Sequence, residues 1–93
     1  MDVTVGLPAV LAGLAGATTL AVAVPDGGTL TDLLDVVRAD HPAVERRIRD
    51  ETGALRRFVN VYVDGDDVRA LAGVATALRP DSEVLVVPSV AGG

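Results

Sequence analysis

The sequence predicts an α+β fold in which one main helix packs across a mixed sheet of four to five strands. Stretches of alternating apolar and polar residues lie on both sides of a segment, residues 29–39, whose apolar side chains have helical spacing. The 93 residues are 49% hydrophobic and 23% charged, which is the composition of ordinary globular domains. A chain of this length forms one domain with a small core, so a deep cofactor cleft is not expected.

Two strands are expected before the helix. Residues 2–7 alternate between polar and apolar side chains with the period of a half-buried strand, and the alternation returns in residues 19–24. The Pro-Asp-Gly-Gly sequence at 25–28 ends the second strand. Residues 8–17, which are rich in Gly and Ala, are expected to form a long, loose loop between two antiparallel neighbours.

The main helix has signals at both ends. Thr29 can cap its first turn, and Asp32 places a carboxylate near the positive end of the helix dipole. The helix should end near Ala39, because His41 precedes Pro42 and a residue before proline avoids the helical region. Its apolar stripe is formed by four residues: Leu30, Leu33, Leu34 and Val37.

A second, short helical turn is expected over residues 43–49. Two of its side chains are expected to point inward and three into water: Val44 and Ile48, and then Arg46, Arg47 and Arg49. His41, the only histidine, is interpreted as a boundary residue between the helices and not as an acid–base catalyst.

The second half of the chain predicts a hairpin and a central strand. Residues 58–63 are rich in β-branched and aromatic residues, and Asp64-Gly65 provides a tight turn from which the chain returns through residues 67–69. Residues 70–78 are expected to cross the fold with at most one short turn. The last strand, residues 83–87, is almost continuously apolar, which is typical of a strand in the middle of a sheet.

The predicted order is strand, strand, helix, strand, strand, strand, which is the order of the β-grasp fold. The long crossover through the helix lets the first and last strands lie side by side in the centre as parallel neighbours. We therefore expect a β-grasp domain over residues 1–88, followed by a flexible Gly-Gly tail, residues 89–93.

The charge pattern and the missing residue types exclude several functions. The net charge is −5, and all eight basic residues are Arg without forming a basic stripe, so nucleic acid is not an expected partner. The acidic surface serves solubility or complements a basic groove on a partner enzyme, and the sequence leaves both open. The chain has no Cys and therefore no thiolate nucleophile or thiolate metal site.

Other candidate sites are weak. Asp64, Asp66 and Asp67 lack the distal bidentate acid of a calcium loop, and a hairpin turn explains them. We expect no metal site, no bound cofactor and no catalytic activity of the chain's own. The apolar residues 1–20 lack a basic leading region and are interrupted by Pro8, so neither a signal peptide nor a membrane span is expected, and the cytoplasm is the default location.

The last residues suggest a tail that enters another protein. Pro88 cannot donate to a sheet, so strand pairing should stop there, and the five residues after it reach about 17 Å at most when extended. Gly92 and Gly93 have no Cβ, so they can pass a narrow tunnel and let enzyme backbone approach the Gly93 carboxylate. The alternative is a frayed end without function.

The ending Leu85-Val86-Val87-Pro88-Ser89-Val90-Ala91-Gly92-Gly93 resembles the C-terminus of the ThiS/MoaD family of ubiquitin-like sulfur carriers. Within that family, residues 57–69 are especially similar to the CysO type of carrier, which serves cysteine synthesis in actinobacteria. The resemblance covers essentially the whole chain, although residues 9–17 contribute little to it. It implies a ubiquitin-like β-grasp and a carrier without catalytic activity.

The resemblance also implies the chemistry and the partners. An E1-like adenylating enzyme would use ATP to activate Gly93, and a sulfur donor would convert it to a thiocarboxylate, with Gly92, Ala91 and Val90 inside the enzyme's tunnel. The sulfur acceptor would be a pyridoxal-phosphate-dependent cysteine synthase, with a zinc peptidase releasing the product, or a thiazole-synthase-like enzyme. The carrier would be a monomer by itself. A ubiquitin-like modifier conjugated through Gly93 is the alternative.

Three residues are candidates for docking these partners. Phe58 and Tyr62, the only two aromatic residues, lie on the same side of the predicted strand 58–63, and aromatic residues are enriched at interfaces. Core packing of at least one of them is the alternative. Val87 is the third candidate, because members of the family contact the activating enzyme near this position.

Overall fold

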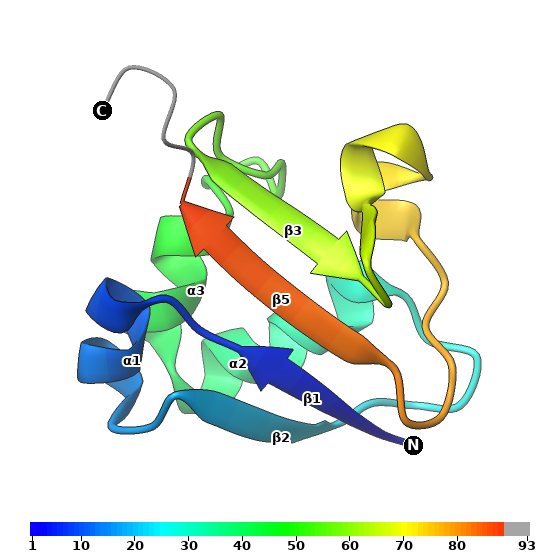
Figure 1. Ribbon diagram of the computed structural model, residues 1–93, viewed down its shortest axis with the longest axis horizontal. Helices are drawn as coiled ribbons and strands as arrows, with labels where there is room; N and C mark the ends of the chain where they lie inside the picture. The colour runs from blue at the N-terminus through cyan, green and yellow to red at the C-terminus, as the bar shows by residue number, and fades with distance from the viewer. Residues whose placement is uncertain (89–93) are drawn as a thin grey trace.

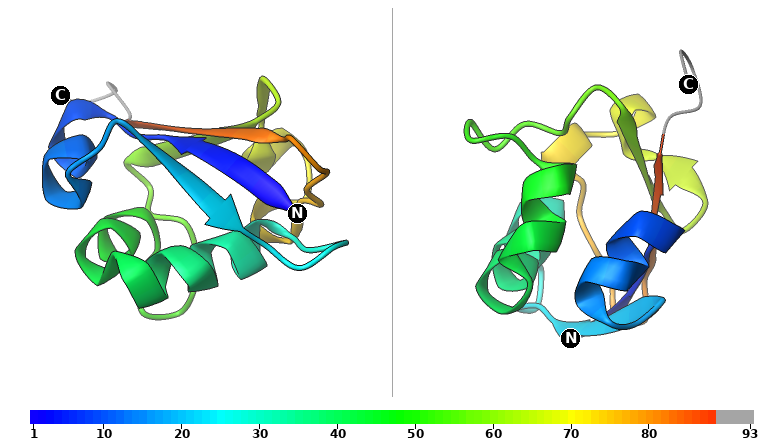
Figure 2. Two further views of the ribbon diagram at one scale, coloured as in Figure 1. Left: turned by 90° about the horizontal axis from the view of Figure 1, so that it is seen from below. Right: turned by 90° about the vertical axis from the view of Figure 1, so that its left-hand side faces the viewer.

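Residues 1–88 are described by the computed structural model, in which five strands form one mixed sheet with helices packed against one face (Figures 1 and 2). The sheet order is β2-β1-β5-β3-β4. The strands are β1 (Asp2–Gly6), β2 (Thr19–Ala23), β3 (Val59–Val63), β4 (Asp66–Asp67) and β5 (Glu83–Pro88). The predicted β-grasp order is confirmed.

The strand β5 lies in the centre of the sheet, as predicted. It pairs in parallel with β1, with Thr4 opposite Glu83, and antiparallel with β3 along most of its length. Its residues alternate between two environments: Val84 and Val86 are buried under the helices, whereas Leu85 is 50% exposed on the other face. The outer face of the sheet is therefore open, although an almost continuous apolar strand is usually covered on both sides.

The main helix α2 (Leu30–Asp40) forms as predicted. The backbone nitrogen of Thr29 donates to Asp32 Oδ2 at 2.8 Å, which ties down the start of the helix. The predicted apolar stripe is almost completely buried against the sheet. The helix ends one residue later than expected, and His41 separates it from α3 (Pro42–Ile48), whose Val44 and Ile48 are buried as predicted.

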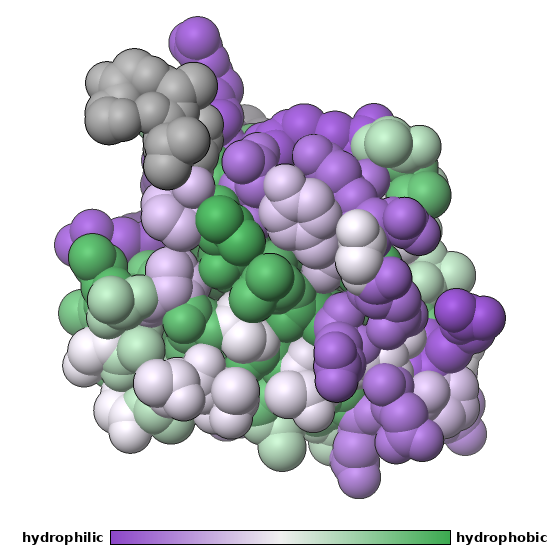
Figure 3. All heavy atoms as spheres, viewed as in Figure 1, coloured by the Kyte–Doolittle hydropathy of each residue, from purple (hydrophilic) through white to green (hydrophobic). Residues whose placement is uncertain are grey.

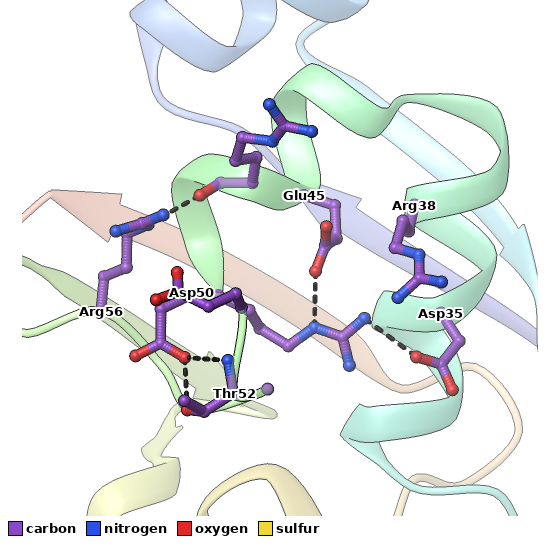
Figure 4. A pocket seen from close by; sticks show the side chains of 10 residues that line it. Asp35, Arg38, Glu45, Asp50, Thr52 and Arg56 are labelled. Carbon is purple, nitrogen blue, oxygen red and sulfur yellow. Dashed lines mark hydrogen bonds and ion pairs between the residues drawn. The ribbon is translucent and has the colours of Figure 1, made fainter.

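The prediction that Arg49 lies in water is wrong. Its side chain is 5% exposed, and its guanidinium donates from Nε to Glu45 Oε2 at 2.7 Å and from Nη2 to Asp35 Oδ1 at 2.9 Å (Figure 4). Burial by itself lowers the pKa of Arg49, but the hydrogen bonds to Glu45 and Asp35 more than offset this and raise it. The ion pairs connect α3 to α2 across the helix layer.

The predicted loop between β1 and β2 contains a helix, α1 (Ala9–Ala15), which sequence reasoning missed. Pro8 precedes its first residue, and Gly16, with φ of 76°, ends it in the left-handed conformation. Leu11 is its one buried residue, so the Ala-rich segment shows no apolar stripe from which a helix could be recognised.

The segment after the β3–β4 hairpin also differs from the prediction. Asp64 and Gly65 have φ of 51° and 90° and form the expected tight turn, but β4 contains only two residues. The expected strand return through residues 67–69 is wrong, because a 3-10 turn, η1 (Val68–Ala70), turns the fully buried Val68 into the core. A second 3-10 turn, η2 (Gly73–Ala75), lies within residues 70–78, where one short turn at most was predicted, so this prediction agrees with the structure.

Among the helices of residues 1–88, none has the length and apolar character that crossing a membrane requires.

Replacing Arg49 by Met should lower the free energy of unfolding by about 3 kcal/mol, because the nearly buried carboxylate of Glu45 loses its partner. The double variant Arg49→Met/Glu45→Leu should regain most of the loss, because it leaves no buried charge unpaired, and Asp35, whose side chain is 58% exposed, stays hydrated. Urea denaturation of the three proteins measures both effects. An Arg49→Met variant as stable as the wild type would contradict the role given to the pair.

Candidate functional site

The end of β5 is where the sequence places the functional tail. Pro88 is the last residue of this strand and lies opposite Val59 at the start of β3, so pairing continues up to the proline itself. The predicted site residues Val90, Ala91, Gly92 and Gly93, and the predicted tail as a whole, lie outside the described residues. The body around Pro88 can be described in detail.

Two of the predicted docking residues share the outer face of the sheet. Tyr62 lies opposite Leu85, and Val87 lies opposite Asn60. Both Tyr62 and Val87 are half-buried and do not belong to the core. In Figure 3, which views this face, hydrophobic side chains gather over the half of β5 nearest its end, with hydrophilic side chains on the β3 side of them and residues of intermediate hydropathy on the β1 and β2 side.

Leu85 belongs to the same apolar surface and was not predicted. An added Cβ on Gly6, its neighbour in β1, would lie only 3.0 Å from Leu85 Cδ1, so the leucine lies directly over a glycine. The signal in the sequence was the alternation of β5, which places Leu85 and Val87 together on the face opposite Val84 and Val86.

Phe58 precedes β3 and is 68% exposed, so core packing does not explain it. The guanidinium carbon of Arg57 lies 5.8 Å from the centroid of its ring, a cation–π contact. Because Val59 lies opposite Pro88, Phe58 stands beside the end of β5. The three docking candidates thus border one region, with Phe58 at its edge.

Arg69 holds the segment that leads into this region. From η1 it donates Nη1 to Asn60 Oδ1 at 3.0 Å and Nη2 to the carbonyl oxygen of Arg56 at 2.9 Å. These two hydrogen bonds join the far side of the hairpin to the residues that precede β3. No pattern in the sequence indicated them.

An apolar groove opens beside Pro88 on the helix side of the sheet, and we call it the tail groove. Its volume is about 350 Å³, and Arg47 is its only charged lining residue. The other lining residues come from the α1 region and from the ends of the central strands: Pro8, Ala9, Val10, Leu11, Val59, Val86 and Pro88. Val10 is 66% exposed, so an apolar side chain faces solvent at this groove.

A larger polar pocket of about 690 Å³ lies between α2, α3 and the loop after α3 (Figure 4). The residues of the Arg49 ion pairs line this pocket, and so does Asp50. The Asp50 carboxylate accepts hydrogen bonds from the hydroxyl and from the backbone nitrogen of Thr52. These bonds, with lesser contributions from the Ala54 backbone and from Arg56, lower the pKa of Asp50. Its basic and acidic residues are equal in number, so it has no marked preference for an anion or a cation.

No group of three or more potential metal-ligating side chains could hold a metal ion within residues 1–88. Asp64 and Asp67 instead accept hydrogen bonds from neighbouring parts of the fold: Asp64 accepts from Ser82 Oγ and from the backbone nitrogen of Glu83, and Asp67 accepts from the backbone nitrogen of Arg69.

The chain is similar to known carrier and modifier proteins. The model of the ThiS family matches residues 5–93. The sulfur carrier protein CysO of Mycobacterium tuberculosis is 37% identical over 95 residues, which cover 100% of both chains. Small archaeal modifier protein 1 of Haloferax volcanii is 38% identical over 83 residues, 89% of this chain and 91% of that protein. The crystal structure of the Amycolatopsis orientalis BexX/CysO complex contains a chain that matches with a TM-score of 0.85 and 32% identity, covering 98% of this chain and 99% of that chain.

The lowered pKa of Asp50 should return toward its ordinary value of 3.8 when Thr52 is replaced by Val, because the hydroxyl hydrogen bond is lost. The stabilisation that Asp50 provides is present above pH 3.8 and disappears as the pH falls through the folded-state pKa. NMR titration of the Asp50 carboxyl carbon in both proteins measures the shift. Identical titration curves would contradict the assignment.

Proposed function

The chain belongs to the ThiS family, and from this premise we propose that it is a sulfur carrier whose working group is the carboxylate of Gly93. Similarity to the CysO sulfur carrier over the full length of both chains carries the proposal. Its relatives are small carriers and ubiquitin-like modifiers and are not catalysts in their own right. We therefore assign this chain the role of a ubiquitin-like carrier.

The proposed chemistry has two steps. A carboxylate oxygen of Gly93 attacks the α-phosphorus of ATP on an adenylating enzyme, pyrophosphate leaves, and an acyl adenylate forms. The sulfur of a sulfide donor then attacks the acyl carbon, AMP leaves, and a thiocarboxylate remains. Sulfur is the better nucleophile at neutral pH, so the modified Gly93 can transfer it to an acceptor.

The body of the carrier contributes presentation and docking in this proposal. The central strand β5 is held between β1 and β3 and leads through Pro88 toward Gly93. Gly92 and Gly93 have no side chain to obstruct a narrow active site. The partner enzymes supply ATP binding and catalysis, and the carrier needs no cofactor of its own.

Cysteine synthesis is the pathway we propose, because the CysO carrier is similar over the whole chain. The acceptor is then a pyridoxal-phosphate-dependent cysteine synthase, and a zinc peptidase releases the product. The BexX/CysO complex of Amycolatopsis orientalis contains a CysO chain bound to a further protein, BexX, which is consistent with a CysO-type carrier serving more than one partner. The second acceptor that we propose is a thiazole-synthase-like enzyme, which the family resemblance implies. We propose that the free carrier is a monomer of the cytoplasm.

The similarity to a small archaeal modifier protein favours one second candidate, conjugation of Gly93 to other proteins. Both functions begin with adenylation of the same carboxylate. The chain contains no Lys, so self-chains through internal lysines are excluded. Conjugates of higher mass in extracts of the native host, detected with an antibody to the carrier, would favour the modifier over the carrier.

Deletion of Gly93, or addition of one Ala after it, should abolish adenylation by the activating enzyme of the native host. Either change displaces the carboxylate from its site by about one residue length, 3.3–3.6 Å, which is more than catalytic positioning tolerates. The measurement is pyrophosphate release dependent on the carrier. Circular dichroism serves as the control for folding, and an unchanged rate with either variant would contradict the role of Gly93.

Replacement of Phe58 by Ser should raise the KM of the activating enzyme for the carrier about tenfold, the effect of losing an exposed aromatic anchor. Leu71→Ser is the matched control, because Leu71 is also large, apolar and exposed but lies in the segment between η1 and η2. Tyr62 and Val87, the other proposed docking residues, can be tested in the same way. Equal KM values for Phe58→Ser and Leu71→Ser would refute docking through Phe58.

A further inference from the structure

The charged side chains of the described residues are distributed unevenly along the sheet. Five exposed arginines gather where β5 ends, and we call them the arginine collar: Arg46, Arg47, Arg56, Arg57 and Arg69. Six acids gather where β1 and β5 begin, and we call this region the acidic end: Asp2, Asp26, Asp64, Asp66, Asp81 and Glu83. The net charge of −5 therefore conceals two regions of opposite sign.

Hydrogen bonds and chain neighbours join the collar arginines to one another, and Arg47 joins the collar to Pro88. Arg47 lines the tail groove together with this proline. Arg56 donates Nε to the carbonyl oxygen of Arg46 at 2.7 Å, and Arg69 donates Nη2 to the carbonyl oxygen of Arg56 at 2.9 Å. Arg57 follows directly in the chain and leads through Phe58 to the residue opposite Pro88.

The acidic end is equally well defined by its contacts. The backbone nitrogen of Glu83 lies 2.9 Å from Asp64 Oδ1, and the backbone nitrogen of Asp81 donates to the carbonyl oxygen of Asp2. Arg79 is the arginine of this end, and its Nη2 lies 4.0 Å from Asp64 Oδ2. The acidic surface therefore lies at the end of the sheet away from Pro88. A partner with a basic groove around Pro88 would not find a complementary surface there.

The collar arginines keep their charge available for a partner. None of the five forms an ion pair with another of residues 1–88. Asp50 and Glu51 border Arg46 and Arg56 on the side of the polar pocket, and they partly balance the charge there. Arg47 instead faces the tail groove, whose other lining residues are all apolar.

We propose, resting on the proposed function, that the enzyme acting on Gly93 meets the collar with an acidic rim and places one apolar side chain in the tail groove. A carboxylate of that rim pairs with Arg47. The charge of the collar and the apolar lining beside it specify this partner chemistry, and an enzyme that encloses the tail must come within about 17 Å of Pro88. The acidic end is repelled by the same rim, so the carrier approaches with its tail end first.

The charge reversal Arg47→Glu tests the rim against a matched control, Arg79→Glu. Each substitution changes the net charge from −5 to −7, but only the first lies in the collar. With the E1-like adenylating enzyme of the native host, Arg47→Glu should raise the KM for the carrier at least about tenfold, and Arg79→Glu should leave it unchanged. The wild-type kcat/KM should fall as salt is added, and that of Arg47→Glu should fall less.

A pair of substitutions on α1 tests the groove. Val10 and Leu14 are 66% and 47% exposed on the same helix, but only Val10 lines the groove. Val10→Asn should raise KM about fivefold and Leu14→Asn should not, because only the first removes apolar contact area from the docked side chain. Circular dichroism and urea midpoints confirm that all four variants are folded.

The outcomes separate this inference from the proposed function. Wild-type carrier that the enzyme fails to adenylate would refute the proposed function and the docking proposal with it. Wild-type carrier that is adenylated, with equal KM values for Arg47→Glu and Arg79→Glu, would overturn the acidic rim alone. Equal values for Val10→Asn and Leu14→Asn would overturn the apolar contact.

Discussion

The parallel pairing of β1 with β5 is the contact on which the rest of the arrangement depends. Parallel neighbours cannot be joined by a tight turn, so the chain between them has to cross the helix side of the sheet and return. Because the two strands run in the same direction, Pro88 at the end of β5 lies at the same end of the sheet as α1, which follows β1 (Figure 1). The antiparallel β3 begins there too. The tail groove, Phe58 and the arginine collar come together for this reason.

Local patterns predicted the parts of the fold that carry a periodic signal. The stripe of α2 and the alternation of the strands have single, clear periods, and the β-grasp order followed from them. The helix α1 was missed because only Leu11 is buried in it. Arg49 was placed in water because its burial depends on Asp35, a residue 14 positions earlier on another helix, which no local pattern connects with it.

The candidate site also has a part that the sequence predicted and a part that only the fold reveals. Gly92 and Gly93 could be selected from the sequence, because a family resemblance and the chemistry of a side-chain-free end both point to them. The collar could not, because its arginines are spread between residues 46 and 69 over α3, the loop before β3 and η1. Only the fold brings them to the end of β5. A sequence with net charge −5 thus presents a basic surface where its tail begins.

The central claim is that Gly93 carries sulfur, and the intact mass of the wild-type chain tests it most directly. After incubation with ATP, the adenylating enzyme of its host and sulfide, the account predicts the mass gain of one sulfur replacing one oxygen. A further gain of one carbamidomethyl group on treatment with iodoacetamide, with iodide leaving and the sulfur retained as a thioester, would identify the sulfur as a nucleophilic thiocarboxylate, since the chain has no Cys. An unchanged mass with an enzyme that is active on another carrier would contradict the account.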